Sequence, residues 1–466
     1  MLAVVITTQC HVNTVWMAMT DRILALLLLL IVLGTPVGIA LNFTGDILLY
    51  FVFLYPLFMS VLWITGGIYF WFHWERHWKW GDEQAVPELK GNPLVSILVP
   101  CFNEGNNIEE TLQFALTQHY ANTEVIAIND GSSDDTGAVL EEMATRYPNL
   151  RVVHLAQNQG KAVALRMGAA AANSEYLVCI DGDAVLDRNA VSYLVAPLIE
   201  HPRLGAVTGN PRIRTRSTLT GRVQVGEFSS IIGLIKRTQR VLGRIFTVSG
   251  VVVAFRRAAL HRVGYWSPDI MTEDIDISWK LQRDHWSIFY EPRALCWILM
   301  PESLKGLWKQ RLRWAQGGGE VFLKNFGIIT HTRYRYMWPL WLEFCFSTLW
   351  GFTFLITLLL WVTGTVIDLP PNLRVTHIVP PSFTGLLLAF VCLLQCGTSI
   401  MIERRYERKL GRELFWVIWY PLVFWALSLL TSVVSFSKVM LSPRGRRARW
   451  VTTDRGVERR DKGESA

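Results

Sequence analysis

The strongest constraint on this chain comes from five stretches that contain no charged residue and are each long enough to cross a bilayer, which takes about 20 apolar residues. They are Ile23–Leu41, Ile47–Phe72, Phe344–Ile367, Phe383–Ile402 and Leu414–Ser437. A cleaved signal peptide is a poor explanation of the first stretch, because it is longer than a usual apolar core and a second stretch follows at once. We therefore predict a multi-pass membrane protein with a soluble-looking middle, flanked by two N-terminal and about three C-terminal spans.

The orientation of the spans follows from lysine and arginine, which favour the cytoplasmic side in short loops. The 403–413 loop carries five of them, whereas the 368–382 loop carries only Arg374. We therefore place the first loop and the middle domain in the cytoplasm. Five simple crossings would leave the basic tail after Lys438 outside, against the same rule. Either the last stretch, which contains Pro421, does not cross simply, or the charge rule gives way, and the sequence leaves both open.

Cysteine spacing and charge argue against several classes of protein. The seven cysteines form no CxxC pair, so neither a disulfide framework nor a zinc site is expected. The net charge of +8 gathers beside the spans, which indicates membrane orientation rather than nucleic-acid binding. No GxGxxG follows the first strand of the middle domain and no GxxxxGK[ST] occurs. Dinucleotide-cofactor and P-loop interpretations therefore lose their main support.

From Leu94 onward the middle domain reads as α/β. Short runs rich in β-branched residues alternate with amphipathic stretches, which is typical of βαβ units around a mainly parallel sheet. The predicted strands are 94–100, 123–129, 151–155, 176–181, 205–207 and 246–255, and the predicted helices are 106–118, 134–147, 160–172 and 188–200. Ligands of such sheets bind at the carboxyl ends of the strands. Polar residues just after each strand are therefore the candidates for a site.

Carboxylates follow three of these strands. Glu104 comes after the first strand, Asp130 ends the second, and Asp181-Gly182-Asp183 ends the fourth. Two aspartates one residue apart at a strand end can hold Mg²⁺ or Mn²⁺, which commonly bridges to substrate phosphates. An isolated DxD is more often a solvated turn, but this one ends a fully apolar strand. We therefore predict a divalent-cation site at Asp181 and Asp183 for a diphosphate ligand.

Five motifs in this order resemble the family 2 glycosyltransferases, which have the GT-A fold. They are Pro100–Glu104, Asn129–Ser132, Asp181–Asp183, Thr272–Asp274 and Gln310–Trp314. In that family the last motif, QxxRW, marks processive synthases such as those of cellulose, hyaluronan and chitin. The order of spans and the stretches 206–216 and 302–318 look most like the bacterial poly-β-1,6-N-acetyl-D-glucosamine synthases. The resemblance covers nearly the whole chain and implies an α/β GT-A (Rossmann-like) cytoplasmic domain with interfacial helices.

The resemblance also implies a donor site. The residues that it places around a nucleotide sugar are Glu104, Asp130, Lys161, Asp181, Asp183, Gln310 and Arg313. It gives Glu104 and Asp130 contacts with the uracil and ribose of UDP, with Lys161 nearby. A carboxylate suits the N–H donor of uracil. Many relatives have two aspartates where this chain has Asn129-Asp130, so one family contact is lost or changed. An ordinary exposed lysine is the alternative for Lys161.

Asp274 is the candidate general base, with Glu273 beside it. Inversion at the anomeric carbon needs one carboxylate that takes the proton of the acceptor hydroxyl while UDP leaves from the opposite face. A glycoside hydrolase would need two carboxylates and no nucleotide. Asp276 competes for the role, and plain acidic residues at a helix N-terminus, stabilised by the macrodipole, are the structural alternative. The motif match favours Asp274.

Residues 304–315 have an apolar face at helical spacing, typical of a helix on a membrane surface. Such a helix does not require Gln310, Arg313 and Trp314 together. A guanidinium can bind a diphosphate and an indole offers a flat apolar face. The resemblance accordingly implies that Arg313 holds the leaving diphosphate and Trp314 the acceptor sugar.

The predicted division of the chain is 1–72 N-terminal membrane region, 73–93 linker, 94–300 GT-A domain, 301–336 interfacial helices, 337–441 C-terminal membrane region and 442–466 basic tail. Residues 221–244 predict another interfacial helix that supports the site. Glu343, at the edge of the third span, is either interfacial or faces a polymer.

The predicted function is a processive inverting transferase that polymerises N-acetylglucosamine from UDP-N-acetylglucosamine and moves the β-1,6 chain across the bacterial inner membrane into a biofilm matrix. The alternatives are another processive synthase, a lipid-carrier transferase, and a non-enzymatic channel or scaffold. The resemblance implies as partners the growing polysaccharide, a small two-span membrane subunit and cyclic di-GMP. The chain shows no separate cyclic-dinucleotide domain.

Overall fold

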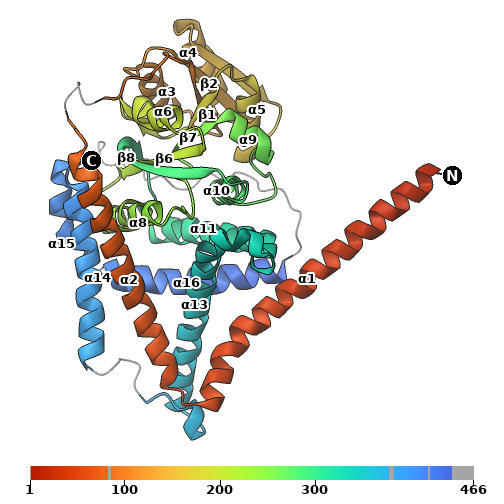
Figure 1. Ribbon diagram of the computed structural model, residues 1–466, viewed down its shortest axis with the longest axis vertical. Coiled ribbons are helices and arrows are strands. Elements are labelled where there is room, and N and C mark those ends of the chain that lie inside the picture. The colour runs from red at the N-terminus through yellow and green to blue at the C-terminus, as the bar shows by residue number, and fades with distance from the viewer. Residues whose placement is uncertain (1, 82–85, 377–381, 418–419, 443–466) are drawn as a thin grey trace.

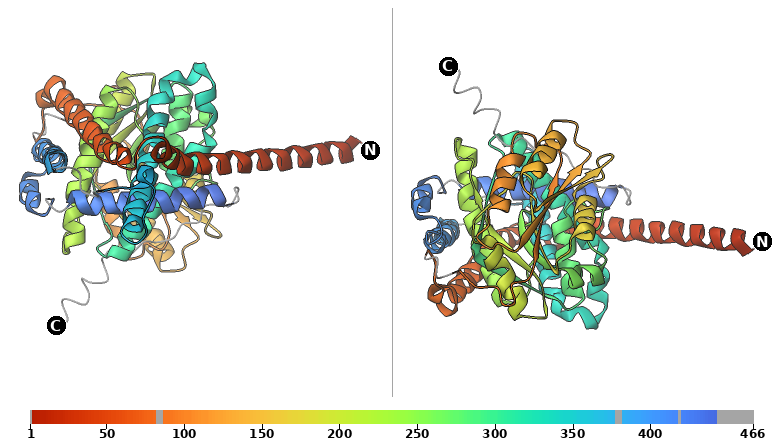
Figure 2. Two further views of the ribbon diagram at one scale, coloured as in Figure 1. Left: turned by 90° about the horizontal axis from the view of Figure 1, so that it is seen from below. Right: turned by 90° about the horizontal axis from the view of Figure 1, so that it is seen from above.

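The computed structural model describes residues 2–81, 86–376, 382–417 and 420–442. An α/β domain lies above a set of long helices, and both ends of the domain lead into those helices (Figure 1). The first helix, α1 (Leu2–Asn42), extends to the side of the rest of the molecule (Figure 2).

One eight-stranded sheet forms the centre of the domain, in the order β3-β2-β1-β4-β7-β6-β8-β5. The strands are β1 (Val95–Cys101), β2 (Thr123–Asp130), β3 (Leu150–Leu155), β4 (Tyr176–Ile180), β5 (Val185–Leu186), β6 (Leu204–Ile213), β7 (Val252–Arg256) and β8 (Ser287–Ile298). Strands β1, β2, β3 and β4 are parallel, as predicted, whereas β7 runs antiparallel to β4 and β6. All residues of β1 and β2 are buried, which matches the continuous apolar runs of strands covered on both faces.

The helices that cover the sheet confirm the predicted α/β layers. One core cluster joins the sheet to α3 (Ile108–Leu116), α4 (Thr136–Arg146) and α6 (Ala190–Glu200). A second cluster joins the opposite face to α5 (Lys161–Ala171), α9 (Arg257–Val263) and α10 (Glu273–Arg283). Helix α5 packs closely because Gly168 lacks a side chain: a Cβ there would lie 2.7 Å from Ile128 Cδ1.

Two strand predictions were wrong in extent, and two strands, the short β5 and the long β8, were missed. The predicted strand 246–255 begins only at Val252, and the residues before it form a loop. Strand β6 continues to Ile213, well beyond the predicted 205–207. The longer missed strand, β8, carries Glu291, Pro292 and Arg293 in its middle, so it shows no clean alternation or apolar run.

Four helices of the described residues are long and apolar enough to cross a membrane, and they match the first four predicted spans. They fall at Asp21–Asn42, Ile47–His77, Thr332–Gly364 and Gly385–Glu403. The helices concerned are α1, α2 (Ile47–His73), α13 (Trp338–Gly364) and α14 (Ser382–Glu403). Two therefore precede the α/β domain and two follow it.

The described residues do not bear out a fifth simple span at 414–437. That stretch contains the short α15 (Leu414–Val417) and most of α16 (Tyr420–Leu441). Helix α16 runs across the direction of α13, beneath α11 (Leu304–Lys324) (Figure 1). It packs there with Val439 Cγ2 3.5 Å from the Cβ position of Gly319. This placement favours the alternative in which the last stretch does not cross, which agrees with the basic character of the sequence after it.

The predicted interfacial helix at 221–244 consists of three segments. They are α7 (Leu219–Glu227), the π-helix η3 (Phe228–Ile235) and α8 (Lys236–Val241). Thr238 of α8 donates a hydrogen bond to the carbonyl of Trp63 in α2 at 2.9 Å. The domain is therefore joined to the membrane helices by close backbone contact.

A buried ion-pair cluster strengthens this joint. Arg237 of α8 pairs with Glu75, just after α2, at 2.6 Å and with Glu403 at the end of α14. Glu403 pairs in turn with Arg212 of β6 at 2.6 Å. Removing one partner of a buried pair costs about 3–5 kcal/mol, because the other charge is left without compensation. The cluster thus fixes α2, α8 and α14 to the sheet.

Candidate active site

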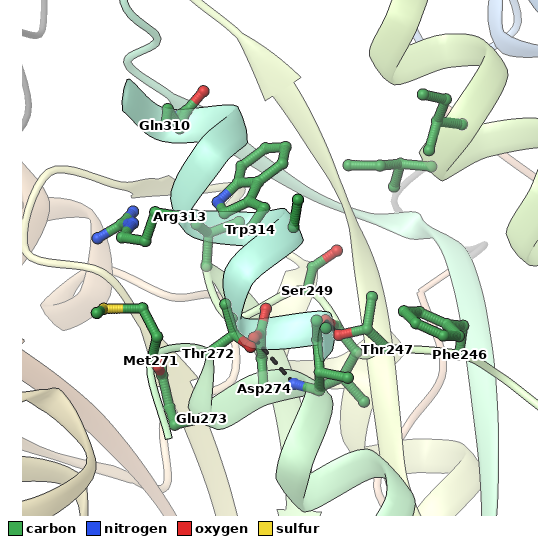
Figure 3. A pocket seen from close by; sticks show the side chains of 18 of the residues that line it. Phe246, Thr247, Ser249, Met271, Thr272, Glu273, Asp274, Gln310, Arg313 and Trp314 are labelled. Atoms are coloured by element: carbon green, nitrogen blue, oxygen red, sulfur yellow. Dashed lines mark hydrogen bonds between the residues drawn. The ribbon is translucent and has the colours of Figure 1, made fainter. Parts of the chain in front are cut away.

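A cavity of about 540 Å³ extends from the carboxyl ends of the strands down to the membrane helices. Its walls come from the segment after β4, the start of α5, the η3–α8 pair, the 246–251 loop, the start of α10, α11, α13 and α16. Figure 3 shows Thr272, Glu273 and Asp274 at the start of α10 below Gln310, Arg313 and Trp314 of α11, with Phe246, Thr247 and Ser249 at the side. The helix that carries the QxxRW motif, α11, therefore forms the wall of the cavity opposite the strand ends.

The structure brings most of the predicted site residues together. The predicted residues that line the cavity are Lys161, Asp181, Asp183, Glu273, Asp274, Gln310, Arg313 and Trp314. Glu104 is buried beside them, with its Cγ 3.1 Å from the Cβ position of Gly182. Asp130 is buried at the neighbouring strand end, where it accepts hydrogen bonds from the backbone N–H groups of Gln159 and Gly160, both at 2.8 Å. Neither Glu104 nor Asp130 is part of the cavity wall.

Lys161 is not an ordinary exposed lysine. Its ammonium lies 2.5 Å from Asp181 Oδ1 and 3.0 Å from Glu273 Oε1, and it donates to the carbonyl of Gly250 at 3.2 Å. Burial alone lowers the pKa of Lys161, but the charges of Asp181 and Glu273 outweigh burial and raise its pKa. Lys161 therefore stays protonated and ties the DxD segment to the start of α10.

The DxD segment fits a cation that is shared with a ligand better than one held by the protein alone. Asp183 lines the cavity, whereas Asp181 already carries the ammonium of Lys161. In the described part of the chain, no group of three or more His, Cys, Asp or Glu side chains could hold a metal ion. Mg²⁺ is usually held by one or two carboxylates together with substrate phosphates. Asp183 can supply such a carboxylate.

Asp274 faces the cavity at the first turn of α10. Its Oδ1 accepts the backbone N–H of Ile275 at 2.9 Å, the dashed line in Figure 3. Burial raises the pKa of Asp274 to about 6, the charge of Glu273 adds to this rise, and Lys161 opposes it. A carboxylate with a pKa near the working pH is suited to accept a proton.

The competing carboxylate, Asp276, has another role. It is fully buried, pairs with Lys324 of α11 at 2.9 Å and with Lys280 at 3.6 Å, and does not line the cavity. Asp276 therefore joins α10 to α11.

The indole of Trp314 is held at the cavity wall by its own helix. The guanidinium of Arg311 lies 4.1 Å from the indole centroid, and its Nη2 pairs with Glu227 of α7 at 2.9 Å. The tilted ring of Phe228 lies nearby, with 6.4 Å between the ring centroids. Trp314 keeps 37% of its surface exposed, so its free face is available to a ligand. The sequence motif contained Arg311 but gave no reason to single it out.

Three polar atoms of the cavity wall have no hydrogen-bond partner among the described residues. They are Thr272 Oγ1, Gln310 Oε1 and Arg313 Nε. Buried polar groups in proteins are almost always hydrogen-bonded, so these atoms are ready to bind a polar ligand.

Two site residues were not predicted from the sequence. Lys236 and Ser249 line the cavity and are buried. Lys236 was interpreted as part of a basic interfacial surface because Arg237 and Arg240 follow it. A lysine directly after the uncharged run 228–235 was the available signal.

Glu343 of α13 lines the membrane end of the cavity, which favours the polymer-facing alternative over a purely interfacial one. One turn further, Ser347 lines the same wall and shares a hydrogen bond of 2.6 Å with Tyr55 of α2. The cavity therefore ends among hydroxyl and carboxyl groups inside the helical region.

Comparison with known proteins agrees with this geometry. Residues 92–317 match the family described as "Glycosyltransferase like family 2". The chain is 39% identical over 409 residues to the poly-β-1,6-N-acetyl-D-glucosamine synthase of Staphylococcus epidermidis strain RP62A, which covers 87% of this chain and 98% of the relative. It is 39% identical over 412 residues to the synthase of the same name from Staphylococcus aureus strain MSSA476, covering 88% and 99%.

Among solved structures, the mannosyltransferase PcManGT from Pyrobaculum calidifontis in complex with GDP-Man and Mn²⁺ covers 84% of this chain and 99% of its own, at a TM-score of 0.49 and 18% identity. We draw no inference about the site from a similarity this low. The family match, the identity over nearly the whole length of the relatives and the α/β domain with its strand-end carboxylates lead to one conclusion. The chain belongs to the family 2 glycosyltransferases and has a GT-A fold.

Proposed function

We propose that the protein polymerises N-acetylglucosamine from UDP-N-acetylglucosamine into a β-1,6-linked chain and passes the chain across the membrane. The observation that carries this proposal is the single cavity that runs from Asp183 past Asp274 and Trp314 to Glu343. The relatives at 39% identity are named for synthesis of the same polymer. A transferase that releases a short product would not need a site that continues between membrane helices.

In the proposed reaction Asp274 is the general base. The acceptor hydroxyl oxygen attacks the anomeric carbon of the donor sugar, and the bond from that carbon to the β-phosphate oxygen of UDP breaks on the opposite face. The hydroxyl proton passes to the Asp274 carboxylate, and UDP leaves with the bonding electrons. One carboxylate suffices for this inversion. Glu273, which is paired with Lys161 at 3.0 Å, supports the site rather than accepting the proton.

Cationic and polar groups at the donor end suit a diphosphate. We propose that Arg313 binds the phosphates, because its Nε has no partner among the described residues, and that Gln310, whose unpartnered atom is the acceptor Oε1, accepts a hydrogen bond from a hydroxyl group of the donor. A guanidinium forms strong charge-assisted hydrogen bonds to phosphate oxygens. Mg²⁺ or Mn²⁺, when bound, would neutralise charge on the leaving diphosphate, and Asp183 would contribute to holding it. Glu104 and Asp130 shape the nucleoside end.

At the other end the site suits a neutral glycan. Trp314 offers a flat apolar face for the acceptor sugar, and Glu343 and Ser347 offer hydrogen-bond partners to sugar hydroxyl groups further along. We propose that the chain leaves past α13 and α16.

We also propose that the protein resides in the bacterial cytoplasmic (inner) membrane with the GT-A domain in the cytoplasm, and that it serves a biofilm matrix. Four apolar helices and the basic 403–413 loop support the orientation. A small two-span subunit and control by cyclic di-GMP rest on the family resemblance alone. Photocrosslinking of cyclic di-GMP to the isolated chain and to a purified complex would test this control.

Incubating membranes that contain the protein with UDP-N-acetylglucosamine and Mg²⁺ tests the proposed function. The expected product is a long polymer whose linkage analysis gives 1,6-linked N-acetylglucosamine and which a β-1,6-hexosaminidase degrades. Membranes with Asp274→Asn serve as the matched control. A short glycolipid, or polymer from another UDP-sugar only, would overturn the proposal.

A further inference from the structure

A buried lysine on the cavity wall has no role in the reaction described so far. Lys236 is the first residue of α8, directly after the π-helix η3, and only 5% of its surface is exposed. Its ammonium donates to Ser249 Oγ at 2.6 Å and to Thr208 Oγ1 at 3.3 Å. π-Helical segments are rare and are frequent at functional sites. Here the segment delivers a lysine side chain to the reaction cavity.

The surroundings of Lys236 differ from those of the other lysine in the cavity. Lys161 pairs with Asp181 and Glu273, whereas no carboxylate of the described residues lies within 4.0 Å of the Lys236 ammonium. Burying a charge without a paired partner is costly. The charged group closest in its electrostatic effect is Asp274. When it is protonated, Lys236 is therefore a buried cation that favours the ionised form of Asp274, the candidate base.

The loop between Lys236 and Asp274 connects the two residues mechanically. Ser249 receives the Lys236 hydrogen bond, and its own backbone N–H donates to Thr208 Oγ1 at 2.7 Å. The next residue, Gly250, abuts the base, since its Cβ position lies 3.4 Å from Asp274 Oδ2. The Ser249–Gly250 segment therefore lies between Lys236 on one side and Asp274 on the other.

We propose that Lys236 is a positioning residue for the base: it fixes the Ser249–Gly250 segment against Asp274 and holds the Asp274 side chain in its ionised form. The inference rests on the role of Asp274 in the proposed function. Through α8 it also links the base to the membrane, because the adjacent Arg237 belongs to the buried ion-pair cluster with Glu75 and Glu403.

Because Lys236 and Asp274 both titrate, the effect of Lys236 on Asp274 should depend on pH. The charged groups facing Asp274 are Glu273, Lys161 and Lys236, and burial with Glu273 raises its pKa to about 6 against the opposing lysines. Burial lowers the pKa of Lys236 to about 7, and Asp274 opposes this change. Near pH 6, therefore, Lys236 is charged and favours the Asp274 carboxylate. Well above pH 7, Lys236 is neutral and its effect disappears.

The test compares pH–rate profiles of UDP release for wild type, Lys236→Met, Lys236→Arg and Ser249→Ala in purified full-length protein. Lys236→Met lacks the cation. The acid limb of its profile, meaning the pH at which the rate falls to half of its maximum on the acid side, should therefore rise by about half to one pH unit. The rate near pH 6 should fall by about two- to fivefold, which follows from that shift. Above about pH 8 the rates should converge. Lys236→Arg keeps the charge and Ser249→Ala keeps the lysine, so their acid limbs should stay at the wild-type pH. An unchanged limb in Lys236→Met, or the same shift in all three variants, would overturn the proposal.

A second readout does not depend on turnover. The infrared carboxyl band that disappears in Asp274→Asn can be titrated in wild type and in Lys236→Met, and its midpoint should rise in the variant. An unmoved midpoint would overturn the proposal. If wild type does not use UDP-N-acetylglucosamine, the proposed function fails while the infrared titration still tests Lys236. A moved midpoint without a kinetic shift would show that Asp274 is not the base, and it would overturn Lys236 as a positioning residue for the base. Methionine has nearly the shape of lysine and no charge, so the variant should fold.

Discussion

The two ends of the cavity are built from different chemistry. Near the donor end two charges are fixed by partners: Lys161 by Asp181 and Glu273, and Asp130, just outside the cavity wall, by two backbone N–H groups. At the membrane end Trp314 presents a free indole face, and Glu343 has no hydrogen bond or ion pair among the described residues. Charged side chains that are held in place by ion pairs and hydrogen bonds suit a nucleotide that must bind in one orientation. Flat faces and few directional bonds suit a neutral chain that must slide.

The largest expected effect lies where the two ends meet. Asp274→Asn should lower the polymerisation rate by about a hundred- to ten-thousandfold, because it removes the proton acceptor. Radiolabelled polymer from UDP-N-acetylglucosamine measures this. Asp276→Asn is the matched control: it should lower thermal stability, through its buried pair with Lys324, while folded protein keeps most of its rate. Equal loss of rate in both variants would contradict the assignment of the base.

At the donor end, Asp183→Asn should raise the Mg²⁺ concentration needed for half-maximal rate by about tenfold or more, since a carboxylate near the cation is lost. Metal titrations at saturating donor measure the change. Asp181→Asn removes one of the two carboxylate partners of Lys161 and should alter donor KM more than metal dependence. If the two variants shift the metal curve equally, both aspartates act on the cation.

On the acceptor side, Trp314→Ala should reduce kcat/KM by about ten- to a hundredfold, because a misplaced acceptor loses the reacting geometry. UDP binding, measured by calorimetry, should stay the same. Trp314→Phe keeps a flat ring and should recover most of the rate. Weakened UDP binding in Trp314→Ala would contradict the assignment of Trp314 to the acceptor end alone.

The pH dependence should follow Asp274. Its pKa, raised by burial to about 6, means that the carboxylate is present above pH 6 and is protonated as the pH falls through that value. The rate should therefore drop by about tenfold per unit below pH 6. A polymerisation profile from pH 4.5 to 9 checks this, and an acid limb near pH 4 would contradict a buried base.

The smallest effect is expected at the membrane end. Glu343→Gln should shorten the polymer by about two- to threefold, since a carboxyl group that can bond to sugar hydroxyls becomes an amide. The initial rate of UDP release should not change. Gel filtration of the product measures chain length, with Ser347→Ala as a milder companion. A loss of initial rate as large as the loss of length would place Glu343 at the donor end instead.

Much of this architecture followed from local sequence. The short apolar runs at 97–99, 125–128 and 177–180 indicate buried strands, and a strand that ends in a carboxylate places that group at the ligand-binding edge. Charge-free stretches of 19 residues or more likewise determined the first four membrane helices. These features depend on neighbours along the chain, so periodicity and composition reveal them.

Other features were decided only by contacts between distant segments. Asp274 and Asp276 are two residues apart and chemically the same, yet one faces the cavity and the other pairs with Lys324, because α10 packs one face against α11. Lys236 and Arg237 are buried because α7, η3 and α8 bring them against the sheet and the ends of α2 and α14. Helix α16 has the composition of a membrane span, yet it runs across the direction of α13, because it packs against α11. The sequence thus determined the chemistry that is present, and packing decided which groups meet.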